Sequence, residues 1–190
     1  AHLLTQYITE EGENMTDPHI WLSPRLTEQI SDEIAKTFIQ LDPQHTSEYT
    51  TNLQSLKSAL QELDAAYQQG LSHCEKKDII TSHTSFGYLA SAYGLNQVSI
   101  AGLSPDAEPS SQQLADIADF AKANDIKIIF FEELVSPKLS QTIAAEVGAD
   151  TMALNPLEGI TDDDMAVGKN YLTEMYQNLD NLKIALACTP

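Results

Sequence analysis

Apolar residues recur at a helical period through the first third of the chain. A first stripe, which ends at the Asp42-Pro43 pair, predicts an amphipathic helix. A second and longer stripe runs from Tyr49 to Leu71, with polar residues between the apolar ones. At a rise of about 1.5 Å per residue this helix is roughly 35 Å long, which is enough to span a domain or to join two. The apolar positions of the first stripe are Leu26, Ile30, Ile34, Phe38 and Leu41.

Short β-rich runs alternate with helical patterns from about residue 77 onward. Four βα units of this kind predict an α/β lobe, with a four-stranded parallel sheet that carries helices on both faces. The third run, IKIIFF, is apolar nearly throughout, as is typical of a central strand. The expected strands are Asp78–Thr81, Val98–Ile100, Ile126–Phe131 and Thr151–Leu154. The expected helices are Ser85–Tyr93, Ser110–Asn124, Pro137–Val147 and Asp163–Leu186.

The βα alternation covers only the later part of the chain, which predicts three regions. Residues 1–43 are expected to form the tail of a preceding lobe, residues 44–73 a long connecting helix, and residues 74–190 a C-terminal βα lobe. The polar stretch from Ala1 to Asp17 has no periodicity and is predicted to be a loop. The chain opens without Met and without the pattern of a signal peptide. We therefore expect that it is the second half of a bilobed protein.

The composition supports a folded core and argues against several partners. Hydrophobic residues make up 42% of the 190 residues, which is enough for a packed interior. The net charge of −18, from 10 basic and 28 acidic residues, repels phosphate backbones, so we expect no nucleic-acid partner. No apolar run approaches the roughly 18 to 20 residues of a membrane-spanning helix.

Three side chains that can bind a metal stand where strands or rigid turns would hold them. His83 directly follows the first expected strand, and Glu158 follows the fourth. Ligands bind at the carboxyl ends of strands in open α/β sheets. His19 lies in the turn DPHIWLSP, which is bracketed by prolines. Two imidazoles and a carboxylate suit Zn²⁺, although a core histidine bonded to a backbone carbonyl is an equally good interpretation of His19 alone.

Other titratable residues have simpler interpretations. Glu132 and Glu133 follow the third strand, where they could accept a hydrogen bond from a ligand histidine, contact a partner protein, or only place charge at a helix start. His2, His45 and His73 lie in polar contexts and are expected at the surface.

The two cysteines, Cys74 and Cys188, have neither CxxC nor zinc-ribbon spacing. One interpretation is a disulfide that fastens the C-terminal helix to the segment before the first strand. The other is a pair of separate buried thiols. A disulfide would indicate an extracytoplasmic compartment.

Five motifs, taken in order, resemble the zinc-specific solute-binding proteins of ABC-type metal uptake systems, the cluster A-I family. They are DPHIWLSP, TSHTSFGYLASAYGL, IAGLSPDAEPS, FFEELVSP and LNPLEGI. The resemblance covers nearly the whole chain and is strongest to the lipoproteins of Gram-positive bacteria. It implies two βα lobes joined by a long helix, with zinc in the cleft between them. This chain then corresponds to the C-terminal portion, without most of the N-terminal lobe.

The resemblance also assigns the metal ligands. The second family histidine matches His19, the third matches His83, and the family glutamate matches Glu158. The first family histidine has no counterpart in this chain. The family usually has Asp at the position of Ser23, a departure that we expect to affect helix capping more than the metal. Similar relatives carry cysteines near both cysteine positions of this chain, which favours the disulfide.

The implied function is the capture of Zn²⁺ outside the cytoplasm and its delivery to the permease of an ABC transporter, with no enzymatic step. The protein is expected to be a periplasmic protein, or a cell-surface lipoprotein whose N-terminal lipid anchor is missing from this chain, and to be a monomer. Because one histidine ligand is missing, we expect weaker zinc binding than in the longer protein. Alternatively, water, an anion or a neighbouring chain completes the site.

Three alternatives stay open from the sequence. A manganese-binding relative would have carboxylates at the two later ligand positions, whereas imidazoles favour zinc. A metallohydrolase would use Glu132 or Glu133 as a base at an open water position, but the sequence has no HExxH motif. An adhesin is the third alternative, because some lipoproteins of the family are proposed to bind host matrix.

Overall fold

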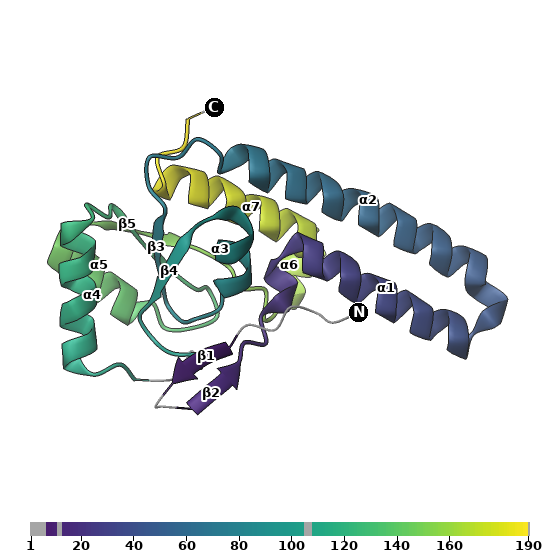
Figure 1. The fold of residues 1–190 in the computed structure, drawn as a ribbon, viewed down its shortest axis with the longest axis horizontal. Helices are drawn as coiled ribbons and strands as arrows, with labels where there is room; N and C mark the ends of the chain where they lie inside the picture. The colour runs from purple at the N-terminus through teal and green to yellow at the C-terminus, as the bar shows by residue number, and fades with distance from the viewer. Residues whose placement is uncertain (1–6, 11–12, 105–107, 190) are drawn as a thin grey trace.

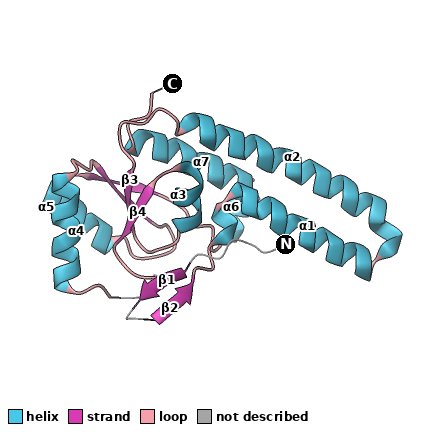
Figure 2. Ribbon diagram, viewed as in Figure 1, coloured by secondary structure: helices cyan, strands magenta, loops and turns pink. Residues whose placement is uncertain are grey.

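The structure is a computed structural model, and it describes residues 7–10, 13–104 and 108–189. A lobe built on a parallel sheet occupies one end, and a hairpin of two long helices projects from it (Figure 1). Figure 2 shows the same parts by secondary structure, with a separate two-stranded ribbon below the lobe. The arrangement confirms the predicted α/β fold class.

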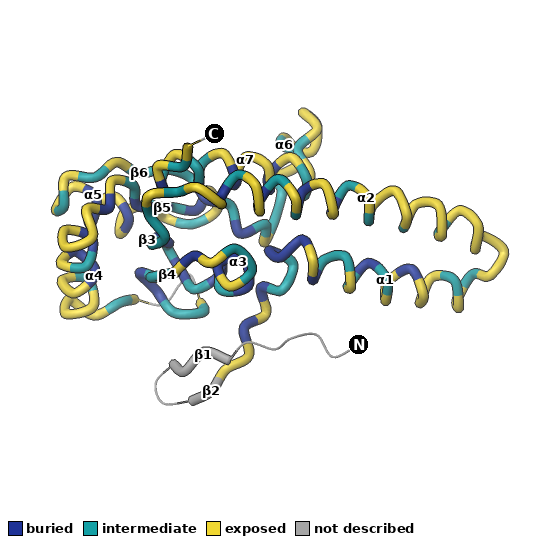
Figure 3. Tube along the Cα trace, turned by 45° about the horizontal axis from the view of Figure 1, so that its top comes forward, coloured by how far each residue is buried: buried dark blue, intermediate teal, exposed yellow. Residues whose placement is uncertain are grey.

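The segment that leads into the lobe consists of η1 (Ile20–Leu22), α1 (Pro24–Leu41), η2 (Pro43–His45) and α2 (Thr46–Gly70). The two long helices confirm both apolar stripes and pack side by side as the hairpin (Figure 1). Near the lobe, α2 buries Leu60, Leu63 and Tyr67, whereas its far half is mostly exposed (Figure 3). No helix in the described ranges is both long and apolar enough to cross a membrane. The hairpin is therefore anchored at its base and reaches into solvent at its tip.

Four strands form the sheet of the lobe: β3 (Asp78–Thr81), β4 (Asn96–Ser99), β5 (Ile128–Phe131) and β6 (Asp150–Ala153). All pairs are parallel, and the order is β4-β3-β5-β6. The apolar third strand, β5, is central, as its composition predicts. All four predicted strands are confirmed, and their carboxyl ends share one edge of the sheet, where ligands bind in folds of this kind.

Four helices cover the two faces of this sheet: α3 (Gly87–Tyr93), α4 (Ser111–Ala123), α5 (Lys138–Val147) and α7 (Tyr171–Ala185). Neighbouring strand residues point to opposite faces. Ile79 and Phe130 belong to the core shared with α2, α3 and α7, whereas Ile80 and Ile129 belong to the core under α4 and α5. The sheet therefore separates two hydrophobic cores, as expected for helices on both faces.

The N-terminal stretch contains an antiparallel ribbon of β1 (Tyr7–Glu10) and β2 (Glu13–Thr16). The predicted loop over residues 1–17 is wrong for these strands. Backbone hydrogen bonds join the strands of such a ribbon, so it can form in a stretch without apolar periodicity. His2 lies outside the described residues.

The C-terminal helix is broken, although the apolar spacing predicts one helix from Asp163 to Leu186. A short helix α6 (Asp162–Ala166) precedes Gly168, whose φ of 92° lies in the region that favours glycine. The side chain of Asn170 then accepts hydrogen bonds from two backbone N–H groups in the first turn of α7. A glycine with positive φ and an N-cap in close succession end one helix and start the next, so the single-helix prediction is wrong.

A disulfide joins Cys74, which follows α2, to Cys188, which follows α7. It confirms the pairing that the resemblance favours. In the first half of α7, the backbone carbonyl of Met175 accepts a hydrogen bond from the Tyr67 hydroxyl at 2.7 Å. The base of the long helix is thus fastened to the last helix of the βα lobe.

Candidate metal centre

His19 lies in the turn between the ribbon and α1, and only 2% of its surface is exposed. Hydrogen bonds hold this turn on both sides of the histidine. The Trp21 indole Nε1 donates to the backbone carbonyl of Pro156 at 2.8 Å. The Tyr88 hydroxyl donates to the backbone carbonyl of Asp17 at 3.1 Å. The turn is thereby tied to the βα lobe at two points.

His83 follows the carboxyl end of β3 and is completely buried. Its backbone carbonyl accepts hydrogen bonds from the Thr81 hydroxyl at 2.9 Å and from the Gln97 side-chain amide at 3.0 Å. Its ring Nδ1 lies 2.6 Å from Oε1 of Glu132, which follows β5. Residues of three neighbouring strands or their ends therefore fix this histidine.

Glu158 comes from the loop after β6, and 34% of its side chain is exposed. Two hydrogen bonds anchor this loop to α7. The backbone N–H of Asn155 donates to the Asn178 side chain at 2.8 Å, and the Asn178 amide donates to the Asn155 carbonyl at 2.7 Å. Leu157 has a positive φ of 57°, which turns the chain sharply just before Glu158.

The three predicted ligands, His19, His83 and Glu158, come together at one point. Nε2 of His19 lies 3.0 Å from Oε1 of Glu158 and 3.4 Å from Nε2 of His83. Nε2 of His83 lies 3.5 Å from the same carboxylate oxygen. Ligand atoms that are about 2.0 to 2.2 Å from a tetrahedral zinc ion lie roughly 3.3 to 3.6 Å from one another. The three atoms therefore have nearly the spacing of one face of such a tetrahedron.

The charges at this point act on His19 in opposite directions. Burial by itself lowers the pKa of its ring, but the hydrogen bonds with Asp17 and Glu158, and the negative charges of both, raise the pKa above its usual value. The net direction is upward. The His19 ring therefore holds a proton more readily than a free histidine does, and a metal ion that binds its Nε2 would have to displace that proton.

The other residues considered from the sequence differ in burial and in their contacts with the site. Glu132 is buried and contacts His83, whereas Glu133 is exposed. His45 and His73 are exposed, as expected. Neither belongs to the group of converging ligand atoms that the described part of the chain contains. Metal binding by this group stays a prediction.

Asp17 was not among the residues that the sequence predicted to belong to the site. This residue is buried, and its Oδ1 accepts a hydrogen bond from the backbone N–H of His19 at 2.9 Å. The same oxygen lies 2.7 Å from Nδ1 of the His19 ring. A signal was present, because an aspartate in a turn commonly hydrogen-bonds the backbone two residues further on.

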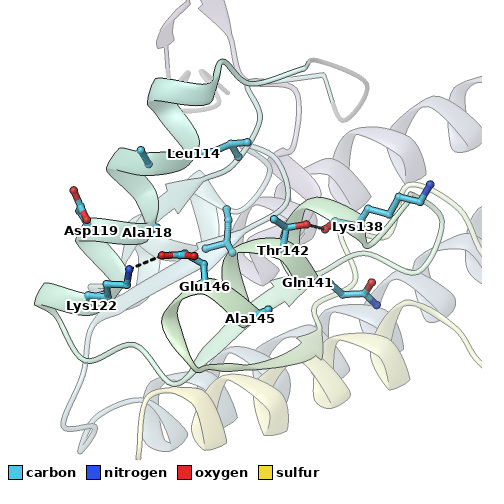
Figure 4. A pocket seen from close by; sticks show the side chains of 11 residues that line it. Leu114, Ala118, Asp119, Lys122, Lys138, Gln141, Thr142, Ala145 and Glu146 are labelled. Atoms are coloured by element: carbon cyan, nitrogen blue, oxygen red, sulfur yellow. Dashed lines mark hydrogen bonds and ion pairs between the residues drawn. The ribbon is translucent and has the colours of Figure 1, made fainter.

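A groove of about 860 Å³ lies elsewhere, between α4 and α5 (Figure 4). An ion pair of 2.8 Å between Lys122 and Glu146 connects the two helices beside it (Figure 4). None of the three converging residues lines this groove. This groove is therefore separate from the candidate site.

Comparison with known proteins decides the family. The family model described as ZnuA, zinc-uptake complex component A, periplasmic, matches residues 2–185. The chain belongs to the ZnuA family. Membership confirms the resemblance that the motifs carry, and the description of the family agrees with the expected compartment outside the cytoplasm.

The curated ZnuA relatives are longer than this chain. The high-affinity zinc uptake system protein ZnuA of Bacillus subtilis (strain 168) is 45% identical over 170 residues, which are 90% of this chain and 53% of that protein. The zinc-binding lipoprotein AdcA of Streptococcus pneumoniae (strain ATCC BAA-255 / R6) is 43% identical over 179 residues, which are 92% of this chain and 35% of that protein. The chain thus spans about half the length of the first relative and less of the second.

Two solved structures show that this part of the ZnuA fold is shared. The Zn(II)-bound ZnuA-like domain of AdcA from Streptococcus pneumoniae has a TM-score of 0.77 at 42% identity, over 90% of this chain and 64% of that one. The laminin-binding protein Lmb of Streptococcus agalactiae, described as bifunctional with adhesin and metal-transporting activity, has a TM-score of 0.83 at 37% identity. That match covers 90% of this chain and 65% of the other.

Proposed function

We propose that this chain is part of a receptor that captures Zn²⁺ outside the cytoplasm and delivers it to the permease of an ABC transporter. The proposed ligands are His19, His83 and Glu158. The observation that carries the proposal is the convergence of their ligand atoms, which lie 3.0 to 3.5 Å apart. The zinc-uptake description of the family and of the relative from Bacillus subtilis supports it.

The types of ligand favour zinc over manganese. Imidazole nitrogens suit Zn²⁺, whereas carboxylate and other oxygen ligands suit Mn²⁺. Two of the three ligand atoms are ring nitrogens, and both rings are buried. The single carboxylate, Glu158, is the most exposed of the three, so an arriving ion meets it first and the imidazoles next. We assign the fourth position of the tetrahedron to water or to a ligand outside this chain.

Capture of the ion needs no reaction other than the loss of a proton from its ligands. The ion takes the place of the proton that Nε2 carries when the His19 ring is charged, and the acidic surface of the chain attracts cations toward the site. The ligands come from segments far apart in sequence, at positions 19, 83 and 158. Bound zinc therefore ties the turn before α1 to the βα lobe, and release requires these segments to part.

The same geometry argues against a metallohydrolase. A general base must reach the water bound to the metal. Glu132 is buried, and its Oε1 is already occupied by the ring of His83 at 2.6 Å. Glu133 is exposed instead. A family of uptake components agrees with a role in binding rather than in catalysis.

Isothermal titration calorimetry with zinc tests the proposal. We expect one zinc ion per chain for the wild type, loss of binding in His83→Ala, and unchanged binding in His45→Ala. The last variant is the control, because His45 is an exposed histidine that bonds to Asp42. Far-UV circular dichroism verifies that each variant is folded. Absence of zinc binding in the wild type, or equal binding by His83→Ala, would overturn the assignment.

Adhesion to host matrix is a second candidate function. It is favoured by the similarity to Lmb of Streptococcus agalactiae, which is described as having adhesin activity. A solid-phase assay with immobilised laminin, using metal-free and zinc-loaded chain, tests it. Saturable binding supports the candidate, and binding no greater than to albumin removes it without affecting the zinc titration.

A further inference from the structure

A carboxylate oxygen contacts each proposed ligand histidine at two points. Oδ1 of Asp17 accepts a hydrogen bond from the backbone N–H of His19 at 2.9 Å and lies 2.7 Å from its ring Nδ1. Oε1 of Glu132 accepts a hydrogen bond from the backbone N–H of His83 at 3.3 Å and lies 2.6 Å from its ring Nδ1. The two carboxylates come from different segments of the chain and yet make the same pair of contacts.

We propose that Asp17 and Glu132 are positioning residues for zinc capture, each of which fixes one histidine with its hydrogen on Nδ1 and its Nε2 lone pair directed at the ion. An ionised carboxylate only accepts hydrogen bonds, so Asp17 and Glu132 each favour the hydrogen on the Nδ1 that they face. At His19 the Glu158 carboxylate, 3.0 Å from Nε2, competes for this hydrogen. Asp17 is closer to its ring nitrogen, at 2.7 Å, and is buried, whereas 34% of the Glu158 side chain is exposed, so we assign the hydrogen to Nδ1. In both rings the other nitrogen, Nε2, is the atom that converges with Glu158. This inference rests on the proposed zinc site and names the residues that prepare it.

The hydrogen bond to the backbone N–H fixes the orientation of each carboxyl group. Because one oxygen holds both the backbone N–H and the ring Nδ1, a rotation of the carboxyl group breaks two hydrogen bonds instead of one. Asp17 is 1% exposed and Glu132 is 3% exposed, so bulk water does not compete for these oxygens. Each ring is therefore fixed relative to its own backbone, which is the preorganisation that a metal site needs.

Asp17 carries a further sign of a role beyond folding. Its second oxygen, Oδ2, is buried without a hydrogen-bond partner among the described residues. A buried carboxylate oxygen without a partner lowers stability. A residue that departs from the stability optimum in this way, directly beside a ligand histidine, fits a requirement of the site.

The positioning role predicts graded effects on zinc affinity. Removal of the group that hydrogen-bonds a metal-bound histidine typically weakens metal binding roughly 10- to 100-fold. We expect zinc affinity to fall by this factor in Asp17→Ala and in Glu132→Ala. Asp17→Asn and Glu132→Gln keep an acceptor oxygen that the backbone N–H holds in place. We expect the zinc affinity of these conservative variants to fall by less than about 10-fold, because the histidine ring keeps its hydrogen on Nδ1.

Nitrogen-15 NMR of the histidine rings measures the tautomer directly. The spectra are recorded on the metal-free chain at a pH above the histidine range, where both rings are neutral. We expect Nδ1–H rings for His19 and His83 in the wild type. Asp17→Ala should shift His19 toward the Nε2–H form and leave His83 unchanged, and Glu132→Ala should do the reverse. Calorimetric zinc titrations of the same variants give the affinities.

Asp64→Ala is the matched control. It removes a carboxylate that contacts Arg25 and Tyr93 and that is not part of the converging group, so it should lower stability without changing ring signals or zinc affinity. The inference is wrong if Asp17→Ala and Glu132→Ala keep the wild-type ring signals and affinity. It is also wrong if they lose no more affinity than Asp64→Ala. If the wild type binds no zinc, the proposed function fails, while the ring signals of the metal-free chain still decide the positioning role.

Discussion

At the scale of single residues, His19 is the place where we expect protons and zinc to compete. Burial lowers its pKa, but the hydrogen bonds and charges of Asp17 and Glu158 raise it above the value of 6.5 that a free histidine has. The resulting stabilisation of the metal-free fold is fully present below that value and is lost as the pH rises through the raised pKa. Zinc binding has the opposite sign, since Nε2 must first lose its proton.

We therefore expect the zinc affinity of the chain to increase as the pH rises through the histidine range, and proton release to accompany binding. Calorimetric titrations in two buffers with different ionisation enthalpies count the protons released at each pH. The increase in melting temperature that saturating zinc causes should grow over the same range. An affinity that is constant with pH, or binding without proton release, would contradict the assignment of His19 as a ligand.

The three residues that converge could be predicted from the sequence, but the orientation of their side chains could not. His83 and Glu158 follow recognisable strands, and His19 lies in a proline-bracketed turn, so each has a local signal. The contact between Glu132 and His83 joins residues that are 49 positions apart, and local sequence does not contain it. Alternation along a strand explains why Glu132 turns inward and Glu133 outward only once the position of the strand is known.

At the scale of elements, the strength of the apolar pattern determined how well each element could be predicted. The long apolar stripes of α1 and α2 have many turns in phase, and the structure confirms both. The strands β1 (YITE) and β2 (ENMT) are as short as the four strands of the sheet, but they lack an apolar run such as IIFF in β5. The break between α6 and α7 was signalled by Gly168 and Asn170, but the apolar spacing of α7 concealed it.

The N-cap of α7 gives a prediction at this scale. The Asn170 side chain accepts hydrogen bonds from the backbone N–H groups of Leu172 and Thr173 at 2.9 and 3.2 Å. Asn170→Ala removes this acceptor and should lower the free energy of unfolding by about 1 kcal/mol, as measured by urea denaturation. Asn170→Asp keeps the acceptor and places a negative charge at the helix N-terminus, so its free energy of unfolding should stay close to that of the wild type. Equal destabilisation by both variants would show that the cap does not stabilise α7.

At the scale of the whole molecule, the candidate site exists only because the fold brings three distant segments together. The alternation of strands and helices was enough to predict the sheet and the edge at which the three side chains converge. It was not enough to predict that the turn before α1 reaches that edge, because the contact depends on the Trp21–Pro156 and Tyr88–Asp17 hydrogen bonds. The division into residues 1–43, 44–73 and 74–190 stays a prediction.

The disulfide provides a prediction for the whole chain. Cys74 and Cys188 are 114 residues apart, so their bond closes a loop that contains the whole βα sheet. Closing a loop of such length restricts the unfolded chain and typically stabilises a protein by about 2 to 4 kcal/mol. We expect the double variant Cys74→Ala/Cys188→Ala to lose about that much free energy of unfolding in urea.

Reductant supplies the control for this prediction. It should destabilise the wild type by a similar amount and leave the double variant unchanged, because only the wild type has a bond to reduce. The zinc affinity should be retained in the double variant, since Cys74 precedes the amino end of β3 and His83 follows its carboxyl end. Equal urea midpoints for the wild type and the double variant would mean that the fold, and not the cross-link, holds α2 against α7.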